Sequence, residues 1–142
     1  MPAFSNSKRD DLVFPDLSFK IVGLAFEVYN ELGAGHLEKV YQAAMAKQLK
    51  DNQIPFTKEI YFPLVFKEEK ISKNYFDFLI DEKIIVDLKR SDQFAKKHYD
   101  QLNHYLRISN LKLGLLISFT QQGVRFKRVV NLKPDQSAQK IS

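Results

Sequence analysis

The stretch YFDFLIDEKIIVDLK, residues 75–89, decides how this chain folds. Its two halves, residues 75–80 and 84–89, are rich in β-branched and aromatic residues, and three polar residues separate them. This pattern predicts a β-hairpin. Each predicted strand also carries one carboxylate among apolar neighbours, Asp77 in the first and Asp87 in the second. The register of the two strands therefore determines what these carboxylates can do.

A three-residue loop at 81–83 gives the predicted hairpin one apolar and one mixed face. The apolar face would hold three cross-strand pairs: Ile80 with Ile84, Phe78 with Val86, and Phe76 with Leu88. The mixed face would pair Leu79 with Ile85, Asp77 with Asp87, and Tyr75 with Lys89. A two-residue loop would scatter the carboxylates over both faces, and a one-residue slip is disfavoured where one face is buried. We therefore predict the three-residue loop, with Glu82 or Lys83 in a left-handed conformation.

In that register Asp77 and Asp87 face each other across the hairpin. Like charges directly opposed on a sheet are destabilising, so the pair calls for a cation between the two carboxylates. Lys89 lies two residues after Asp87 and on the same face, because side chains alternate along a strand. The hairpin thus predicts a cation site with a lysine beside it.

A helix is predicted after residue 15, with Asp16 or Ser18 as its N-cap and Gly33 as its stop. Its apolar residues recur at helical spacing: Ile21, Val22, Ala25, Val28, Tyr29 and Leu32. We interpret this helix as a packing element of the core.

A second helix is predicted from about Leu37, after a turn that contains Gly33 and Gly35. Its core stripe would be Leu37, Val40, Tyr41, Ala44 and Gln48. Glu38 lies at the border of this stripe. Its carboxylate is either solvated in the first turn, where the helix dipole favours it, or turned into a pocket. The pattern alone favours the solvated position.

The elements beside the hairpin are less regular. Residues 57–66 predict a strand with an edge or bulge at Pro63, and residues 67–70 a charged turn. After the hairpin comes a helix to about residue 108, followed by a buried strand at 111–119. A helix between two strands predicts a crossover to a parallel neighbour.

The chain ends in a strand at 124–130 that alternates basic and apolar residues. Arg125 and Lys127 share one face and Arg128 lies on the other. These bases are either an electropositive surface for nucleic acid or protection of an edge strand against aggregation.

Length and composition bound the class of protein. The chain has 142 residues, of which 44% are hydrophobic, so we expect one folded domain at 16–132, with a flexible arm at 1–15 and a disordered tail at 133–142. A net charge of +5 favours an anionic partner such as nucleic acid. The absence of cysteine excludes disulfides, thiol nucleophiles and the zinc deaminase reading of the His-x-Glu at 36–38. With no signal core and no membrane-length apolar run, a cytoplasmic location is expected.

The hairpin resembles the P-D-(D/E)-x-K nuclease superfamily. Asp77 matches its first acid and residues 87–89 match its (D/E)-x-K element, although Phe76 stands in place of proline and Asp87 in place of the commoner glutamate. Gly35, Glu38 and Tyr41 match the name motif of the GxxExxY branch of that superfamily. The stretch from His98 to Leu106 is similar to the family's His-x-x-Gln-x-x-x-Tyr-Leu element.

The resemblance implies a three-layer α/β/α restriction-endonuclease-like core with a mixed β-sheet. Two N-terminal helices would precede a three-strand meander, a crossover helix and two further strands. The expected ligands of Mg²⁺ or Mn²⁺ are the side chains of Glu38, Asp77 and Asp87 and the backbone carbonyl of Leu88. Lys89 would orient or deprotonate the attacking water.

The crossover helix would complete the site. In the resemblance Gln101 and Tyr105 hold that water or a phosphate, and His98 either contacts phosphate or fills space. The expected nucleic-acid contacts are His98, Arg125 and Lys127. Many members of the superfamily dimerise so that two sites cut two strands, which leaves a homodimer open here.

We therefore expect a metal-dependent nuclease acting on phosphodiester bonds, with DNA favoured over RNA as substrate. A catalytically weak or inactive nucleic-acid-binding module on the same fold is the alternative, since a fold does not fix a function. A structural or partner-binding protein is the third hypothesis. It predicts no salt-dependent affinity for DNA, whereas a phosphate binder must lose affinity steeply with salt.

Overall fold

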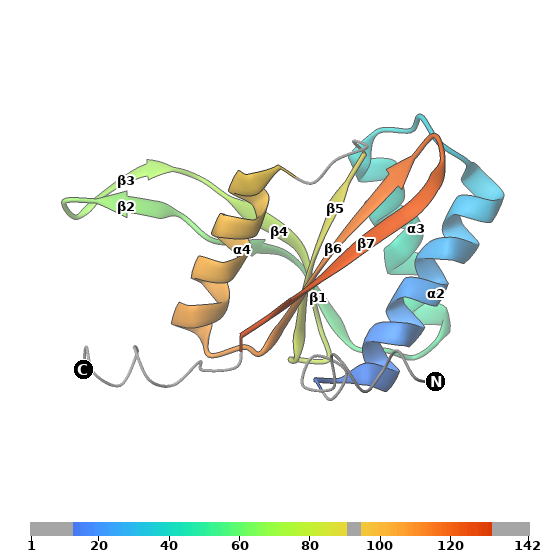
Figure 1. Ribbon diagram of the computed structural model, residues 1–142, viewed down its shortest axis with the longest axis horizontal. Coiled ribbons are helices and arrows are strands. Elements are labelled where there is room, and N and C mark those ends of the chain that lie inside the picture. Colours follow the sequence, from blue (N-terminus) through green and yellow to red (C-terminus); the bar gives the residue numbers. More distant parts are fainter. Residues whose placement is uncertain (1–12, 91–94, 132–142) are drawn as a thin grey trace.

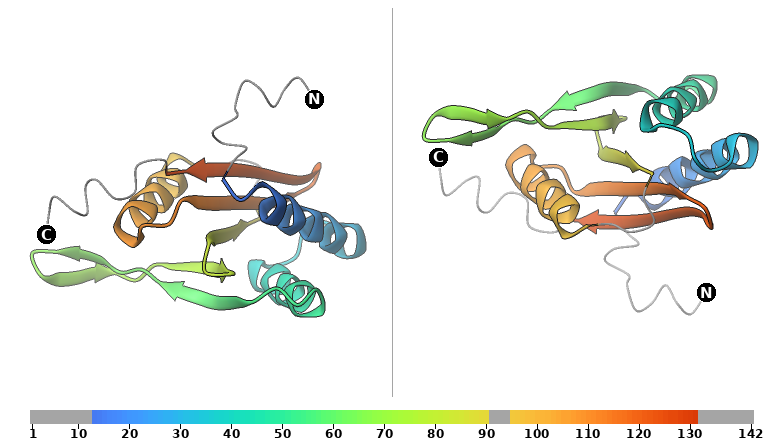
Figure 2. Two further views of the ribbon diagram at one scale, coloured as in Figure 1. Left: turned by 90° about the horizontal axis from the view of Figure 1, so that it is seen from below. Right: turned by 90° about the horizontal axis from the view of Figure 1, so that it is seen from above.

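A computed structural model describes residues 13–90 and 95–131 of the chain. Most of the expected N-terminal arm and all of the expected C-terminal tail lie outside the described residues. Three layers make up the fold (Figures 1 and 2). Helices α2 (Pro15–Leu32) and α3 (Glu38–Asp51) cover one face of a sheet, and α4 (Lys96–Ser109) lies on the other. In the described ranges no helix is long and apolar enough to cross a membrane.

The central sheet has five strands in the order β1-β4-β5-β6-β7. Their bounds are Phe56–Tyr61 for β1, Tyr75–Ile80 for β4, Ile84–Lys89 for β5, Leu113–Thr120 for β6 and Gly123–Val130 for β7. Strands β5 and β6 pair in parallel across the α4 crossover, and the other neighbours are antiparallel. The mixed sheet, the two leading helices and the crossover confirm the predicted fold class.

The β4–β5 hairpin has the predicted register. Its pairs are Phe78 with Val86, Leu79 with Ile85, and Ile80 with Ile84, which confirms the three-residue loop. Left-handed backbone occurs at Asp81 and Glu82, so of the two residues predicted for this conformation Glu82 adopts it. The alternation of buried positions fixed this register, because a slip would have turned the apolar set outward.

The prediction of a single apolar face is wrong at one position. Phe78, Ile80, Val86 and Leu88 all pack in the core beneath α2 and α3. Phe76 instead lies in the cluster on the α4 face, where its ring is 5.1 Å from that of Tyr105 and 5.8 Å from that of Phe62. Phe76 lies before the first residue of β4 that pairs with β5, so pairing with β5 does not determine which face it takes. Its contacts with the aromatic rings on the α4 side determine this.

Helix α2 begins without the predicted side-chain cap. Phe14, at φ 48°, precedes Pro15 at the first helical position, and neither Asp16 nor Ser18 caps the helix. Ser18 is buried, where its hydroxyl donates to the Pro15 carbonyl and accepts a hydrogen bond from Arg128. The predicted stop at Gly33 is confirmed.

The buried face of α3 differs from the predicted stripe. Tyr41, Met45 and Leu49 are fully buried, whereas Leu37 and Val40 are exposed. Spacings of three and four residues place Glu38 one turn before Tyr41 on the same side of the helix, although Glu38 itself is exposed.

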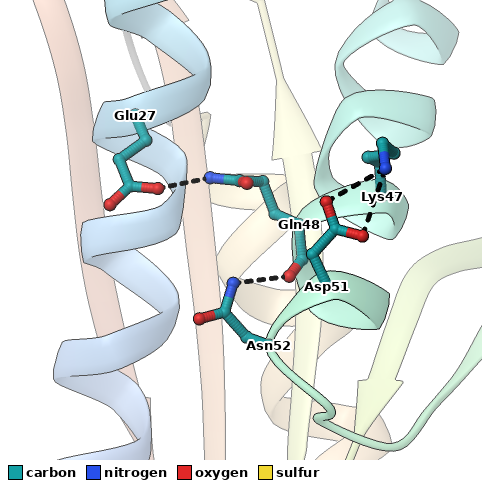
Figure 3. A network of polar contacts seen from close by, with 5 residues as sticks. All are labelled: Glu27, Lys47, Gln48, Asp51 and Asn52. Atoms are coloured by element: carbon teal, nitrogen blue, oxygen red, sulfur yellow. Dashed lines mark hydrogen bonds and ion pairs between the residues drawn. The ribbon is translucent and has the colours of Figure 1, made fainter.

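A polar network fastens the C-terminal half of α3 to α2 (Figure 3). The Gln48 amide donates to Glu27 at 2.7 Å, and Asn52 donates to the Gln48 carbonyl at 2.8 Å. Lys47 and Asp51 form an exposed ion pair one turn apart. The helix pair is thus held together at this end by side chains of both helices.

Residues 64–72 form a second, two-stranded sheet of β2 (Leu64–Phe66) and β3 (Glu69–Ser72). Both views in Figure 2 show this hairpin projecting from the domain on the side of α4. A single strand over 57–66 is therefore wrong, because β1 ends before Pro63 and β2 belongs to another sheet. The charged turn is confined to Lys67 and Glu68, both left-handed.

Candidate active site

The two predicted aspartates meet where the β4–β5 hairpin opens. Asp77 lies beyond the last paired residues of β4, and its Oδ2 accepts a hydrogen bond from the Leu88 N–H at 2.7 Å. Its Oδ1 accepts from Gln42 Nε2 at 3.0 Å, and Asp87 lies near enough to raise the pKa of Asp77. The strand backbone and α3 together fix the Asp77 carboxyl group.

The pKa of Asp77 is raised to about 8, from an ordinary value of 3.8, with burial as the largest cause. The proximity and negative charge of Asp87 contribute to this value, while the Leu88 N–H opposes the shift. Two carboxyl groups brought this close cannot both ionise without a compensating charge. Without a bound cation, the pair therefore favours sharing one proton.

Lys89 lies beside the second aspartate. Its Nζ is 3.1 Å from Asp87 Oδ2, and the two side chains are only 22% and 11% exposed, respectively. This pair places a positive charge at the edge of the carboxylates while leaving Asp77 without a cation of its own. The structure thus brings together Asp77, Asp87 and Lys89, the three residues that the hairpin register predicted would share a face.

His98, in the first turns of α4, also faces this group. Burial lowers its pKa, and the neighbouring Lys89 charge lowers it further against the opposing effect of Asp87. Its Nδ1 is buried and has no hydrogen-bond partner within the described ranges. A buried polar nitrogen without a partner is uncommon in folded proteins, and here it lies beside the carboxylates.

Glu38 approaches from the opposite side, at the first position of α3. It is exposed, yet it is near enough for its charge to raise the pKa of Asp77. Among the residues that the structure describes, no three acidic, histidine or cysteine side chains converge closely enough to form a ready-made ligand cluster. Glu38 is therefore near the aspartate pair without completing it.

The two other residues predicted on α4 have different surroundings. Gln101 Nε2 donates to the Asn74 side-chain oxygen at 3.1 Å, which ties α4 to the residue before β4. Tyr105 packs among Phe62 and Phe76, and burial raises the pKa of its hydroxyl. Gln101 therefore contacts Asn74, which precedes the strand that carries Asp77. Tyr105 belongs mainly to the aromatic cluster.

The basic residues of β7 line up with the site across the sheet. In the strand register Lys89 pairs with Ser118, which pairs with Arg125. Asp87 pairs with Leu116, which pairs with Lys127. Arg125 and Lys127 are exposed. Arg128 points to the other face, where it donates to Ser18 and to the Val13 carbonyl, so its role is in packing.

The sequence interpretation missed Gln42, which contacts Asp77, and Asn74, which contacts Gln101. Gln42 lies four residues after Glu38, so helical spacing could have placed both on the side that faces Asp77. Asn74 carries no comparable signal, because its contact with Gln101 joins segments 27 residues apart.

The donors at the hairpin opening fit a hard divalent cation. Carboxylate and carbonyl oxygens are the ligands that such ions prefer. Lys89 forms an ion pair with Asp87, whereas no residue that the structure describes forms one with Asp77. A divalent cation would supply positive charge at Asp77.

The family model for the PD-(D/E)XK nuclease superfamily matches residues 15–129. The chain belongs to this superfamily. The match covers both leading helices, the hairpin with its aspartates, the crossover helix and the last two strands. Its members hydrolyse nucleic acids with divalent metals, so membership supports a hydrolytic nuclease with a nucleic-acid substrate.

Solved structures with a similar fold include two proteins of low sequence identity. SSO0001 has a TM-score of 0.49 and 20% identity, over 71% of this chain and 54% of that one. An alkaline exonuclease, LHK-Exo from Laribacter hongkongensis, has a TM-score of 0.47 and 9% identity, over 72% of this chain and 59% of that one. This chain thus spans little more than half of either protein. No curated protein matches it.

Proposed function

We propose that this member of the PD-(D/E)XK superfamily is a Mg²⁺- or Mn²⁺-dependent nuclease that hydrolyses phosphodiester bonds in DNA. The observation that carries the proposal is the joining of Asp77, Asp87 and Lys89 at the opening of one hairpin. A buried pair of acids with a raised pKa and an adjacent lysine is costly for a purely structural sheet. It is useful where a cation and a phosphate must bind.

Four groups would hold the metal. Asp77 and Asp87 supply carboxylate oxygens, and Glu38 supplies a third from α3. The N–H and C=O of one strand residue point to the same side, and the Leu88 N–H points to Asp77. The Leu88 carbonyl therefore faces the opening too, where β4 no longer pairs with β5. This supports its role as the fourth ligand.

When bound, the metal would lower the pKa of a coordinated water and stabilise negative charge on phosphorus. Lys89, held at 3.1 Å from Asp87, would orient that water and add positive charge where the transition state becomes more negative. Gln42 and the Leu88 N–H would keep the Asp77 carboxyl group oriented.

The surrounding residues would position the nucleic acid. His98 has a free buried Nδ1 in the described structure and would hydrogen-bond to a phosphate or the water. Gln101 and Tyr105 would support the same region from α4. Arg125 and Lys127 are exposed on β7 and align through β6 with Lys89 and Asp87. They would contact phosphates further along the nucleic-acid strand.

We further propose that the chain belongs to the GxxExxY branch, on the match at Gly35, Glu38 and Tyr41. A cytoplasmic location is also proposed, because a chain without cysteine suits a reducing compartment.

The test is cleavage of labelled plasmid, linear and branched DNA, and of RNA of matched sequence, with Mg²⁺ or Mn²⁺. Wild type is compared with Asp87→Ala and Lys89→Ala, with folding checked by circular dichroism. Metal-dependent cutting of DNA that both substitutions abolish is the expected result. Cutting that survives Asp87→Ala would contradict the proposed site.

One observation favours a second function, a nucleic-acid-binding module with weak catalysis. Glu38 is exposed, and no three-residue ligand cluster is preformed within the described residues. The same assay separates the two. Salt-sensitive DNA binding without cleavage, retained by Lys89→Ala, would favour the binding module.

A further inference from the structure

The hydroxyl of Tyr41 organises the corner between α2 and α3. It donates a hydrogen bond to the Gly33 carbonyl at 2.7 Å and accepts one from the His36 N–H at 3.3 Å. The Tyr41 ring is fully buried and stacks on Phe119 of β6, with ring centroids 4.1 Å apart and planes 2° from parallel. The two ends of the connecting loop thus meet at a single oxygen atom held against the sheet.

The other residues of this corner are arranged around Tyr41. Gly33 and Gly35 have φ values of 73° and 93°, which favour glycine although there is space for a Cβ at both. The His36 ring stands edge-on to Tyr41, with centroids 5.7 Å apart, and its Nε2 donates to the Leu32 carbonyl at 2.8 Å. The histidine of the His-x-Glu stretch is therefore part of this corner.

Glu38 is the residue that this corner delivers to the site. It is the first residue of α3, two positions after His36, and lies one helical turn before Tyr41. No side chain caps the start of α3, since Leu37 occupies the N-cap position. The Tyr41 hydroxyl, together with the His36 ring, thus fixes the backbone leading into Glu38 through polar side-chain contacts.

The far end of α3 is held independently. Gln48 donates to Glu27 (Figure 3). It also donates to the Leu24 carbonyl on α2. Loss of the Tyr41 hydroxyl would therefore leave α3 attached to α2 and stacked on Phe119. It would loosen the end that carries Glu38.

We infer that Tyr41 is a positioning residue for Glu38, setting the distance of the Glu38 carboxylate from the Asp77–Asp87 pair through the Gly33–His36 corner. This inference rests on the proposed metal site. It assigns Tyr41, three residues after Glu38, a functional role in addition to its packing in the core. Residues that orient metal ligands from behind commonly change metal affinity by about 10- to 100-fold when removed.

The test is Mn²⁺ affinity by calorimetry in wild type, Tyr41→Phe and Tyr29→Phe. Tyr29 is a matched control, because its hydroxyl also donates to a backbone carbonyl at 2.7 Å, that of Thr120. We expect Tyr41→Phe to weaken Mn²⁺ binding about tenfold or more, and Tyr29→Phe to change it less than about twofold. Thermal unfolding with chelator checks that both variants remain folded.

A double-mutant cycle with Glu38→Gln separates positioning from general loosening. If Tyr41 acts through Glu38, Tyr41→Phe should have no further effect on Mn²⁺ affinity in the Glu38→Gln background. An equal loss in both backgrounds, or a Tyr41→Phe affinity like that of Tyr29→Phe, would overturn this inference alone. Wild-type protein that binds no Mn²⁺ would overturn the proposed metal site and this inference with it.

Discussion

The β4–β5 hairpin has two unlike ends. At its closed end, the turn at residues 81–83 follows the pair Ile80–Ile84, and both isoleucines are fully buried. At its open end the pairing stops after Phe78 and Val86, and Asp77 and Asp87 meet beyond it. The closed end pairs regularly between buried isoleucines, at the cost of left-handed backbone at Asp81 and Glu82. The open end brings two acids together and gives up ladder pairs.

The difference teaches where stability and chemistry reside in this fold. The closed end gains from apolar burial, which scales with area removed from water. The open end gains nothing comparable, because two acids share a buried position and one must stay protonated. Departures from locally favourable structure concentrate at functional sites, and each prediction below tests one end against the other.

The largest expected effect on stability is in the buried, paired part of the hairpin. Phe78 is fully buried and packs 5.5 Å from the Phe56 ring. Phe78→Ala should lower the free energy of unfolding by about 3–5 kcal/mol, from lost burial and the resulting cavity. Urea unfolding with chelator measures this. Tyr75→Ala, in the same strand but 57% exposed, should cost less than about 0.5 kcal/mol, and a similar cost for both would contradict the comparison.

A smaller effect is expected where α4 packs on the sheet. Gly114 pairs with Ile85 near the closed end, and an added Cβ there would lie 2.7 Å from the Leu102 side chain. Gly114→Ala should destabilise by about 1–3 kcal/mol through overpacking. It should also shift the α4 helix that carries His98.

Gly23→Ala is the matched control for that substitution. Gly23 is exposed within α2 and has nothing within 4 Å of an added Cβ, so alanine should stabilise by up to about 1 kcal/mol through helix propensity. Thermal unfolding of both variants measures the contrast. Destabilisation by Gly23→Ala, or none by Gly114→Ala, would show that the packing of α4 against β6 is described wrongly.

The most gradual effect is the pH dependence of the open end. The folded-state pKa of Asp77, about 8, exceeds its ordinary 3.8, so the folded metal-free protein binds this proton more tightly than the unfolded chain does. The resulting stability is fully present below about pH 4 and is lost as pH rises through about 8, so the free energy of unfolding should slope downward with pH between these values.

Asp77→Asn should remove that slope. Unfolding free energies of wild type and Asp77→Asn, measured with chelator between pH 4 and 9, isolate the contribution of this one carboxyl group. Parallel pH profiles for the two proteins would mean that Asp77 titrates normally in the folded state.

The sequence determined the closed end almost completely. Alternation in residues 75–89 predicted the strands and the loop length. At the open end it also predicted that Asp77 and Asp87 lie near each other, although the ladder stops before them. The face taken by Phe76 was not predictable, because it depends on Phe62 and Tyr105, which are distant in sequence. The local sequence pattern predicts the structure where neighbouring strands pair. It does not predict which of two layers a residue packs into.

The helices show the same limit. Glycine at 33 predicted the end of α2, because the conformation there is a local property. The buried face of α3 was predicted partly wrong, since Leu37 and Val40 are as apolar as the residues that pack, and only the position of α2 and the sheet decides between them. The strand β3 was missed, because its sequence of charged and exposed residues carries no burial signal.

The most direct test of the central claim compares two aspartates of one hairpin. Mn²⁺ binding is measured by calorimetry for wild type, for Asp77→Asn at the open end and for Asp81→Asn at the closed end, where Asp81 pairs with Lys83 at 3.0 Å. We predict that wild type binds Mn²⁺, that Asp77→Asn weakens this binding at least about tenfold, and that Asp81→Asn leaves it unchanged. Equal affinities for the two variants would contradict a metal site at the open end.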